Sequence, residues 1–291
     1  MKFSEILKAI KDSLKVLNSK VSTRTLAIIL SIVLICAVAF IPWLSQHLGD
    51  QGRNSSNNPA TTGGARPLAL VYRGPGGCKG CSEATAALLQ SSKWNFEVKF
   101  VGPKEPLELS AATLKSAVLY AQPGGKGDAR RAYKKIMRQL DDPNVISDWV
   151  KAGGRYLGIC MGGYLAGDSP TVPGFGVLPG TVGEWIHSPG ASWTSDKDTV
   201  LQVNWRDHLR WMYFQDGPYF QLNPGATGVQ VLATYTNGKI AALVAPHGKG
   251  KVAVVGPHPE ADETWYSEYN LTDPDGPDAD LGHDLINTLM E

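Results

Sequence analysis

The sequence predicts an α/β domain with a mixed, mainly parallel sheet flanked by helices and preceded by one N-terminal transmembrane helix. Two observations lead to this prediction. From residue 67 onward, short apolar runs alternate with helical patterns, an order typical of parallel strands joined by crossover helices. Residues 26–44 form nineteen consecutive positions without a charge, close to the roughly 20 residues that cross a bilayer.

Composition limits the classes of function. The 291 residues are 43% hydrophobic and 19% charged, enough for one large domain or two small ones. The net charge is +1, and no basic run is interleaved with aromatic residues. The sequence therefore predicts no nucleic-acid partner.

The first 44 residues predict a membrane-anchored protein. In residues 1–25, apolar residues recur at three- and four-residue steps and lysines lie on the other face, as in an amphipathic helix. This excess of positive charge keeps the leader cytoplasmic. We expect residues 26–44 to be an uncleaved signal anchor, although Ala37–Ala39 resembles a cleavage site and leaves a cleaved signal peptide open. Cleaved or not, the segment orients the chain so that the rest is extracytoplasmic.

A linker and a globular domain follow the anchor. Residues 45–66 are polar, rich in Gly, Asn, Ser and Thr, and lack periodicity, so they predict a flexible tether. The α/β domain spans residues 67–291. Asn54 and Asn270 begin N-glycosylation acceptor patterns, which matter only in a eukaryotic secretory pathway.

Apolar periodicity places the elements of this domain. The first half predicts strands at 68–72, 96–101, 117–121 and 156–159, and helices at 82–90, 128–140 and 145–151. The second half predicts strands at 200–203, 229–235, 240–245 and 251–255, separated by short turns, and a closing helix at 281–290. Between strands 200–203 and 229–235, residues 205–220 are rich in aromatic side chains, which we expect to pack in the core or to line a substrate pocket.

Cys160 lies where the predicted strand 156–159 meets a helix, in the sequence Gly158-Ile-Cys-Met-Gly162. This is the glycine, x, nucleophile, x, glycine pattern of a nucleophile elbow with cysteine as the nucleophile. The sharp turn needs glycines beside the nucleophile and is expected to push the thiol outward. The adjoining helix N-terminus favours the thiolate.

Two further segments follow strand ends. His258-Pro-Glu260 follows strand 251–255, and a histidine with a nearby carboxylate supplies a base and a group that orients it. Gly124 and Gly125 follow strand 117–121, and their N–H groups, with that of Met161, could form an oxyanion hole. Because ligands bind beyond the carboxyl ends of strands in open α/β sheets, we expect all three segments to meet.

Five motifs together resemble the class I glutamine amidotransferase-like superfamily, and within it the N-terminal domain of biotin-protein ligase. They are VYRGPGG at 71–77, QPGGKGD at 122–128, GGRYLGICMGGYLAG at 153–167, DGPYF at 216–220 and GPHPEAD at 256–262. The resemblance implies a flavodoxin-like fold and a catalytic triad of Cys160, His258 and Glu260. It implies no biotin transfer, since these 291 residues lack the Gly/Arg-rich nucleotide loop of the ligase.

The resemblance departs from a glutaminase at one place. Typical members of the superfamily carry a glutamine shortly after the elbow to hold the substrate amide, whereas Gly163-Tyr-Leu165 follows here. We therefore expect a cysteine hydrolase acting on a small-molecule or peptide amide or acyl substrate, rather than on glutamine. The alternative is a binding or regulatory module that keeps the fold without turnover.

Cys78-Lys-Gly-Cys81 opens the first predicted helix. Outside the membrane a disulfide between the two is expected, shaping the rim of the site. A thioredoxin-like redox protein and a soft-metal site made of these thiols with Cys160 and His258 are weaker alternatives.

The acidic segment 273–280 suggests Ca²⁺, but it lacks the glycine and terminal glutamate spacing of an EF-hand loop. A solvated turn in which Asp280 caps the closing helix fits better. The sequence thus predicts neither a metal nor a cofactor.

Overall fold

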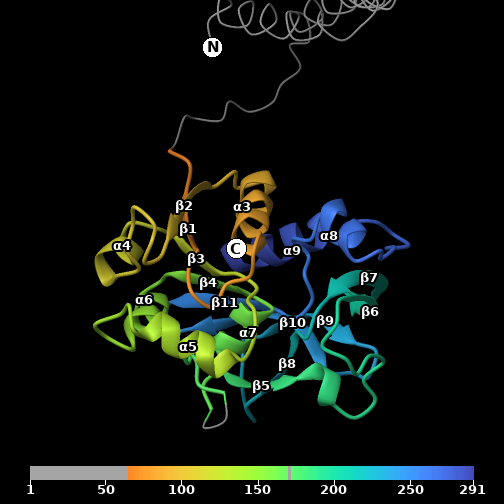
Figure 1. Ribbon diagram of the computed structural model, residues 1–291. Helices are drawn as coiled ribbons and strands as arrows, with labels where there is room; N and C mark the ends of the chain where they lie inside the picture. The colour runs from red at the N-terminus through yellow and green to blue at the C-terminus, as the bar shows by residue number, and fades with distance from the viewer. Residues whose placement is uncertain (1–64, 170–171) are drawn as a thin grey trace, which may run out of the picture. The chain divides into compact units, whose positions relative to one another are not determined.

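A mixed sheet organises the protein in the computed structural model, which describes residues 65–169 and 172–291 (Figure 1). Its parallel core runs in the order β2 (Glu97–Val101), β1 (Leu68–Tyr72), β3 (Leu119–Gln122), β4 (Arg155–Ile159) and β11 (Gly250–Val255). This is the flavodoxin-like strand order 2-1-3-4-5, with β11 as the fifth strand. Every residue of β3 is buried, as expected for a strand covered by helices on both faces.

Helices cover the two faces of the parallel core and enclose two separate hydrophobic clusters (Figure 1). On one face pack α3 (Cys81–Ser91) and α9 (Ala279–Met290). The other face carries α4 (Ala111–Lys115), α5 (Ala129–Met137), α6 (Val145–Lys151) and α7 (Met161–Ala166). Side chains alternate between the faces along each strand: Ala69 and Val71 of β1 join the first cluster, and Leu70 and Tyr72 join the second.

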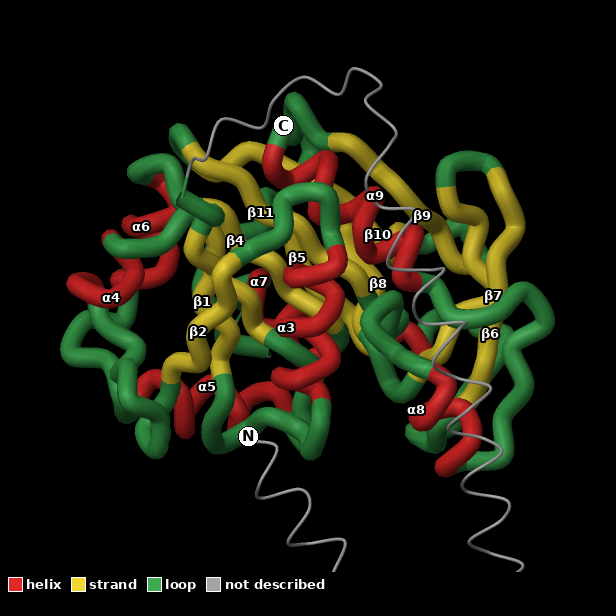
Figure 2. Tube along the Cα trace, turned by 90° about the horizontal axis from the view of Figure 1, so that it is seen from above, coloured by secondary structure: helices red, strands yellow, loops and turns green. Residues whose placement is uncertain are grey.

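The second half of the chain continues the sheet with antiparallel strands, which Figure 2 shows beside the parallel core. Next to β11 come β10 (Ile240–His247), β9 (Gln230–Tyr235), β6 (Thr199–Trp205) and β7 (His208–Phe214). A side branch holds β8 (Pro218–Leu222), which pairs with β10, and β5 (Gly180–Glu184), which pairs with β8. The 3₁₀ helix η2 (Trp185–His187) follows β5, and α8 (Glu263–Glu268) lies between β11 and α9.

The expectation of a mainly parallel sheet holds only for the core. Among the described residues, four strand pairs are parallel and six are antiparallel. The reason is the short connections of the second half: β6 and β7 are joined by Arg206 and Asp207, both at positive φ, and such a two-residue loop can only join antiparallel strands.

The leader at 1–25, the predicted membrane segment at 26–44 and most of the tether at 45–66 lie outside the described residues. Within the described ranges, 65–169 and 172–291, no helix combines the length and the hydropathy needed to cross a bilayer. Residues 65–291 form one compact unit.

Candidate functional site

Cys160 lies in a strained turn between β4 and α7. Its backbone has φ 48° and ψ −105°, a conformation that is costly for a residue with a side chain and is typical of functional sites. Its N–H donates to the carbonyl of Val255 on β11 at 2.9 Å. The glycines of the motif are needed for space: a Cβ on Gly162 would lie 1.9 Å from the carbonyl oxygen of Gln122. The local sequence therefore dictates the turn that the elbow pattern predicts.

His258 and Glu260 follow β11 and form a buried pair. His258 Nδ1 lies 2.9 Å from Glu260 Oε1, and the side chains are 3% and 0% exposed. The backbone N–H of His258 donates to Tyr213 on β7. The rings of Tyr213 and Trp265 pack against the imidazole, with centroids 5.8 Å and 5.3 Å from it. The hydrogen bond to Glu260, the backbone bond to Tyr213 and the rings of Tyr213 and Trp265 thus fix the orientation of the imidazole.

Cys160 and His258 meet, as the pattern of strand ends predicts. Burial lowers the pKa of His258, but the charges of Glu260 and Cys160, together with hydrogen bonds to both, outweigh it and hold this pKa well above its usual value. An imidazole that keeps its proton near neutral pH is the partner that stabilises a thiolate. The geometry thus brings together a sulfur, a ring and a carboxylate in the order that a triad needs.

The sulfur is less accessible than the elbow pattern predicts. Cys160 is only 4% exposed, and its thiol contacts the carbonyl of Gln215 at 3.6 Å. Gln215 and Asp216 lie in the three-residue connection from β7 to β8, where the Tyr164 hydroxyl donates to the carbonyl of Asp216 at 3.2 Å. Because this connection covers the elbow, the turn does not expose the thiol as expected.

The three groups predicted to form an oxyanion hole are neighbours. A Cβ on Gly125 would lie 2.8 Å from the Cβ of Met161, and one on Gly124 would lie 2.9 Å from His258 Cε1. Among the described residues, the N–H groups of Gly124 and Gly125 donate no hydrogen bond. Met161 is the first residue of α7, where backbone N–H groups lack partners within the helix.

Cys78 and Cys81 form a disulfide at the N-terminus of α3. Their sulfurs would lie 3.5 Å and 3.3 Å from a Cβ on Gly124, so the disulfide borders the same turn as His258. Sulfurs joined in a disulfide are not thiolate ligands. Within the described ranges, no group of three or more His, Cys, Asp or Glu residues is arranged to hold a metal.

The acidic segment 273–280 surrounds an arginine. Arg210 on β7 pairs with Asp275, Asp278 and Asp280 at 2.8–3.0 Å. Asp278, which is fully buried, occupies the position expected for Asp280 and precedes α9 as its N-cap. The Arg210 guanidinium thus supplies positive charge to the aspartates for which the sequence had suggested Ca²⁺.

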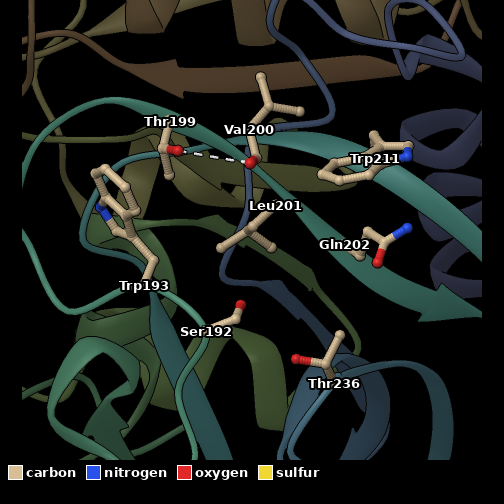
Figure 3. A pocket seen from close by; sticks show the side chains of 8 residues that line it. All are labelled: Ser192, Trp193, Thr199, Val200, Leu201, Gln202, Trp211 and Thr236. Atoms are coloured by element: carbon tan, nitrogen blue, oxygen red, sulfur yellow. Dashed lines mark hydrogen bonds between the residues drawn. The ribbon is translucent and has the colours of Figure 1, made fainter.

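The aromatic segment 205–220 divides between the core and a separate cavity. Trp205, Tyr213, Phe214 and Phe220 are buried, whereas Trp211 lines a hollow of about 220 Å³ opposite Trp193 (Figure 3). None of the triad residues lines this cavity. Of the predicted glycosylation sites, Asn270 is exposed just after α8, and Asn54 lies outside the described residues.

Sequence reasoning missed two neighbours of the triad. Gln215 acts through its backbone carbonyl, which no side-chain pattern reveals. Trp265 lies seven residues after His258 in the sequence, and its ring packs against the imidazole. A large aromatic residue so close in sequence to His258 was the available signal.

Comparison with known proteins assigns the first part of the domain. Residues 68–171 match the family model described as biotin-protein ligase, N-terminal. These residues are similar to that family, and the match covers about a third of the chain. The matched part includes Cys160 and both glycines of the predicted oxyanion hole, and it ends before His258 and Glu260.

A curated relative extends the likeness. The biotin–protein ligase of Schizosaccharomyces pombe is 30% identical over 223 residues, covering 66% of this chain and 33% of the relative. The chain therefore spans about a third of the length of that ligase. The relationship is distant, and it is limited to that third of the ligase.

Solved structures show the same fold. A glutamine amidotransferase from Thermotoga maritima has a TM-score of 0.52 at 18% identity, covering 78% of this chain and 98% of its own. A second solved glutamine amidotransferase has a TM-score of 0.49 at 19% identity, covering 66% and 90%. The Thermotoga structure shows that the chain has a glutamine amidotransferase-like α/β fold, as the sequence motifs imply.

Proposed function

We propose that the protein is a cysteine-dependent hydrolase of an amide or related acyl substrate, anchored to a membrane by residues 26–44. The observation that carries this proposal is the buried His258–Glu260 pair, 2.9 Å apart, beside a cysteine whose charge raises the pKa of that histidine. Burying an ionisable pair is costly unless a partner stabilises it, and a thiolate at Cys160 supplies that partner.

The geometry supports a two-step reaction. The Cys160 thiolate adds to the substrate carbonyl carbon, and the developing oxyanion faces the N–H groups of Gly124, Gly125 and Met161. His258 gives its proton to the departing amine or alcohol, leaving a thioester on Cys160. Water then attacks the thioester, His258 takes up the water proton, and the acid product leaves. Glu260 keeps the ring oriented and stabilises its charge throughout.

Glutamine is a poor fit to this site. Tyr164 lies one helical turn after Cys160, where its N–H donates to the carbonyl of Cys160, and its hydroxyl is engaged with the carbonyl of Asp216. A bulky phenol therefore borders the nucleophile near the place where the superfamily holds the amide of glutamine. We infer a substrate whose acyl group is differently shaped.

A second candidate function is a binding or regulatory module without turnover. The 4% exposure of Cys160 favours it, since an acyl substrate reaches the sulfur only if the connection at Gln215 and Asp216 moves aside. The two candidates differ in the reactivity of the thiol, which is measurable without knowledge of the substrate.

The test is the rate of Cys160 alkylation by iodoacetamide near neutral pH, followed by peptide mass spectrometry in the full chain. For a hydrolase we expect His258→Ala to slow the rate by about tenfold or more, because only the thiolate reacts with iodoacetamide and the variant loses the imidazolium that stabilises the thiolate. The exposed His208 at the start of β7 offers a control: His208→Ala should leave the rate unchanged. Equal, slow rates in all three proteins would favour the module.

A further inference from the structure

The Cys78–Cys81 disulfide is joined to the turn that carries Gly124 and Gly125. The N–H of Cys78 donates to the carbonyl of Gly124 at 3.3 Å, and the N–H of Lys126 donates to the carbonyl of Gly76 at 3.2 Å. These two bonds make an antiparallel bridge between Gly77 and Gly125. The loop that bears the disulfide and the turn of the predicted oxyanion hole are therefore one hydrogen-bonded unit.

Gly124 connects this unit to the imidazole. A methyl group added to Gly124 would lie 2.9 Å from His258 Cε1 and 3.3 Å and 3.5 Å from the sulfurs of Cys81 and Cys78. The ring and both sulfurs thus border one small space beside this glycine. Any shift of the disulfide loop is felt at His258, because close-packed interiors transmit displacements instead of absorbing them.

The disulfide loop depends on the crosslink for its shape. The segment from Gly74 to Gly80 contains four glycines, and Gly76 and Gly80 have φ of 100° and 84°. Glycine-rich segments lose the most conformational freedom on ordering. The crosslink ties Cys78 in this loop to Cys81, the first residue of α3, and so fixes the loop to a rigid element.

We propose that the Cys78–Cys81 disulfide is a redox-sensitive positioning element of the proposed active site: when oxidised it holds the Gly124–Gly125 turn against His258, and its reduction slows the chemistry of Cys160. This inference rests on the proposed function. The disulfide acts through Gly124 and His258 and does not itself touch substrate.

The burial of the two sulfurs sets the route of reduction. Cys81 is 2% exposed and Cys78 is half-buried, so a thiolate of an external dithiol attacks Cys78. A mixed disulfide forms at Cys78 and the Cys81 thiolate leaves, stabilised at the N-terminus of α3. The second thiol of the reagent then displaces Cys78. Two electrons pass to the protein, which gains two thiols, while the dithiol becomes a cyclic disulfide.

The experiment compares oxidised and reduced full-length protein. Dithiothreitol is applied and removed under argon, and iodoacetamide alkylation is followed on the Cys160 peptide alone. We expect reduction to slow alkylation of Cys160 by about tenfold, since small misplacements of catalytic groups have effects of that order or larger, and reoxidation to restore the rate. An unchanged or faster rate in the reduced protein would overturn the inference, because a loop that was merely loosened would expose the sulfur.

Two variants separate positioning from general loosening. Cys78→Ser/Cys81→Ser should alkylate Cys160 as slowly as the reduced wild type and should not respond to dithiothreitol. In His258→Ala the redox state should have no effect on the Cys160 rate, and a persisting effect would contradict action through His258. Should the double variant fail to fold, as judged by circular dichroism, the reversible change in wild type remains decisive.

The outcomes distinguish this inference from the function on which it depends. Slow alkylation of oxidised wild type, equal to that of His258→Ala, rejects the hydrolase itself. Fast alkylation that is equal in the oxidised and reduced forms rejects only the role of the disulfide.

Discussion

At the residue scale, Asp216 is a strained group near the nucleophile with an unsatisfied carboxylate oxygen. Among the described residues, its Oδ1 is buried without a hydrogen-bond partner, and its backbone has a φ of 48°. Burial and the nearby carboxylates of Glu184 and Asp196 raise its pKa to about 6. Strained, unsatisfied groups of this kind cluster at functional sites, which fits its place beside the covering connection.

The raised pKa predicts a pH-dependent stability. The folded state binds a proton at Asp216 more readily than the unfolded state does, because the carboxyl of the unfolded state titrates near its usual pKa of 3.8. The charged Asp216 carboxylate therefore lowers the free energy of unfolding, and this effect reaches its full size above about pH 6. The effect disappears as the pH falls from about 6 to below 3.8, where the carboxyl is protonated in both states. Asp216→Asn should raise Tm by a few degrees at pH 7.5, since about 1 kcal/mol shifts Tm by roughly 2–4 °C in a domain of this size.

Solvent screening keeps this effect small, because Asp216 is only half-buried. Thermal unfolding of both proteins at pH 7.5 and pH 3.5 checks the prediction. A Tm gain that is as large at pH 3.5 as at pH 7.5 would show that removal of the charge is not its cause.

His258 shows how opposing effects are decided at a single residue. Desolvation alone would leave a buried imidazole neutral, but two nearby acidic groups reverse the result. From sequence, the His-Pro-Glu spacing indicates the carboxylate partner. It gives no sign of the burial, which depends on Tyr213 and Trp265 from other elements.

At the element scale, the elbow depends on the close packing of β4, α7 and β3. Gly158 and Gly162 lie where a Cβ would fall 2.4 Å and 1.9 Å from backbone oxygens of Gly162 and Gln122. The Tyr156 hydroxyl also donates to the carbonyl of Gly162 at 2.7 Å. Backbone atoms cannot move aside as a flexible side chain can, so these contacts tolerate no side chain.

Gly162→Ala is therefore expected to push α7 away from β3. We predict a loss of about 1–3 kcal/mol in the free energy of unfolding, the usual effect of overpacking, together with slower alkylation of Cys160. Gly167→Ala is the matched control at the other end of α7, where the nearest atoms to a Cβ would be the two methyl groups of Val182 at 3.1 Å and 3.3 Å and φ is −74°. Urea unfolding measures the free energy of unfolding of both variants. An equal decrease in the two would contradict the packing argument.

The elements differ in how well the sequence predicts them. Strong apolar runs place β1, β4 and β11 within about one residue, because strands buried on both faces read as continuous apolar segments. β7 and β8 were missed. Their aromatic and charged residues lack a clear period, since Arg210 on β7 faces the acidic segment while Phe214 faces the core.

At the scale of the whole molecule, the site is a product of the strand order. About 90 residues, which include α7 and the antiparallel strands, separate β4 from β11 in the sequence, yet the two strands are neighbours in the sheet. That pairing brings Cys160 and His258 together at the carboxyl ends of the strands, where α/β sheets bind ligands. The sequence predicts this meeting from strand ends alone.

The cover over the site could not be predicted in the same way. Gln215 contacts Cys160 and Asp216 contacts Tyr164 in the connection that leads to β8, a strand that pairs with β10 and β5 off the main path of the sheet. Such branching depends on long-range pairing that no local pattern encodes. The accessibility of the nucleophile is thus a property of the complete fold, whereas motifs alone lead to the prediction of Cys160, His258 and Glu260 as a triad.

The most direct test of the central claim is the protonation of His258, measured by NMR titration of the imidazole in the full chain. If sulfur, ring and carboxylate act as one charged unit, the pKa of His258 in wild type lies well above 6.5 and falls in both Cys160→Ser and Glu260→Gln. A His258 that titrates near its ordinary value in all three proteins would contradict the account.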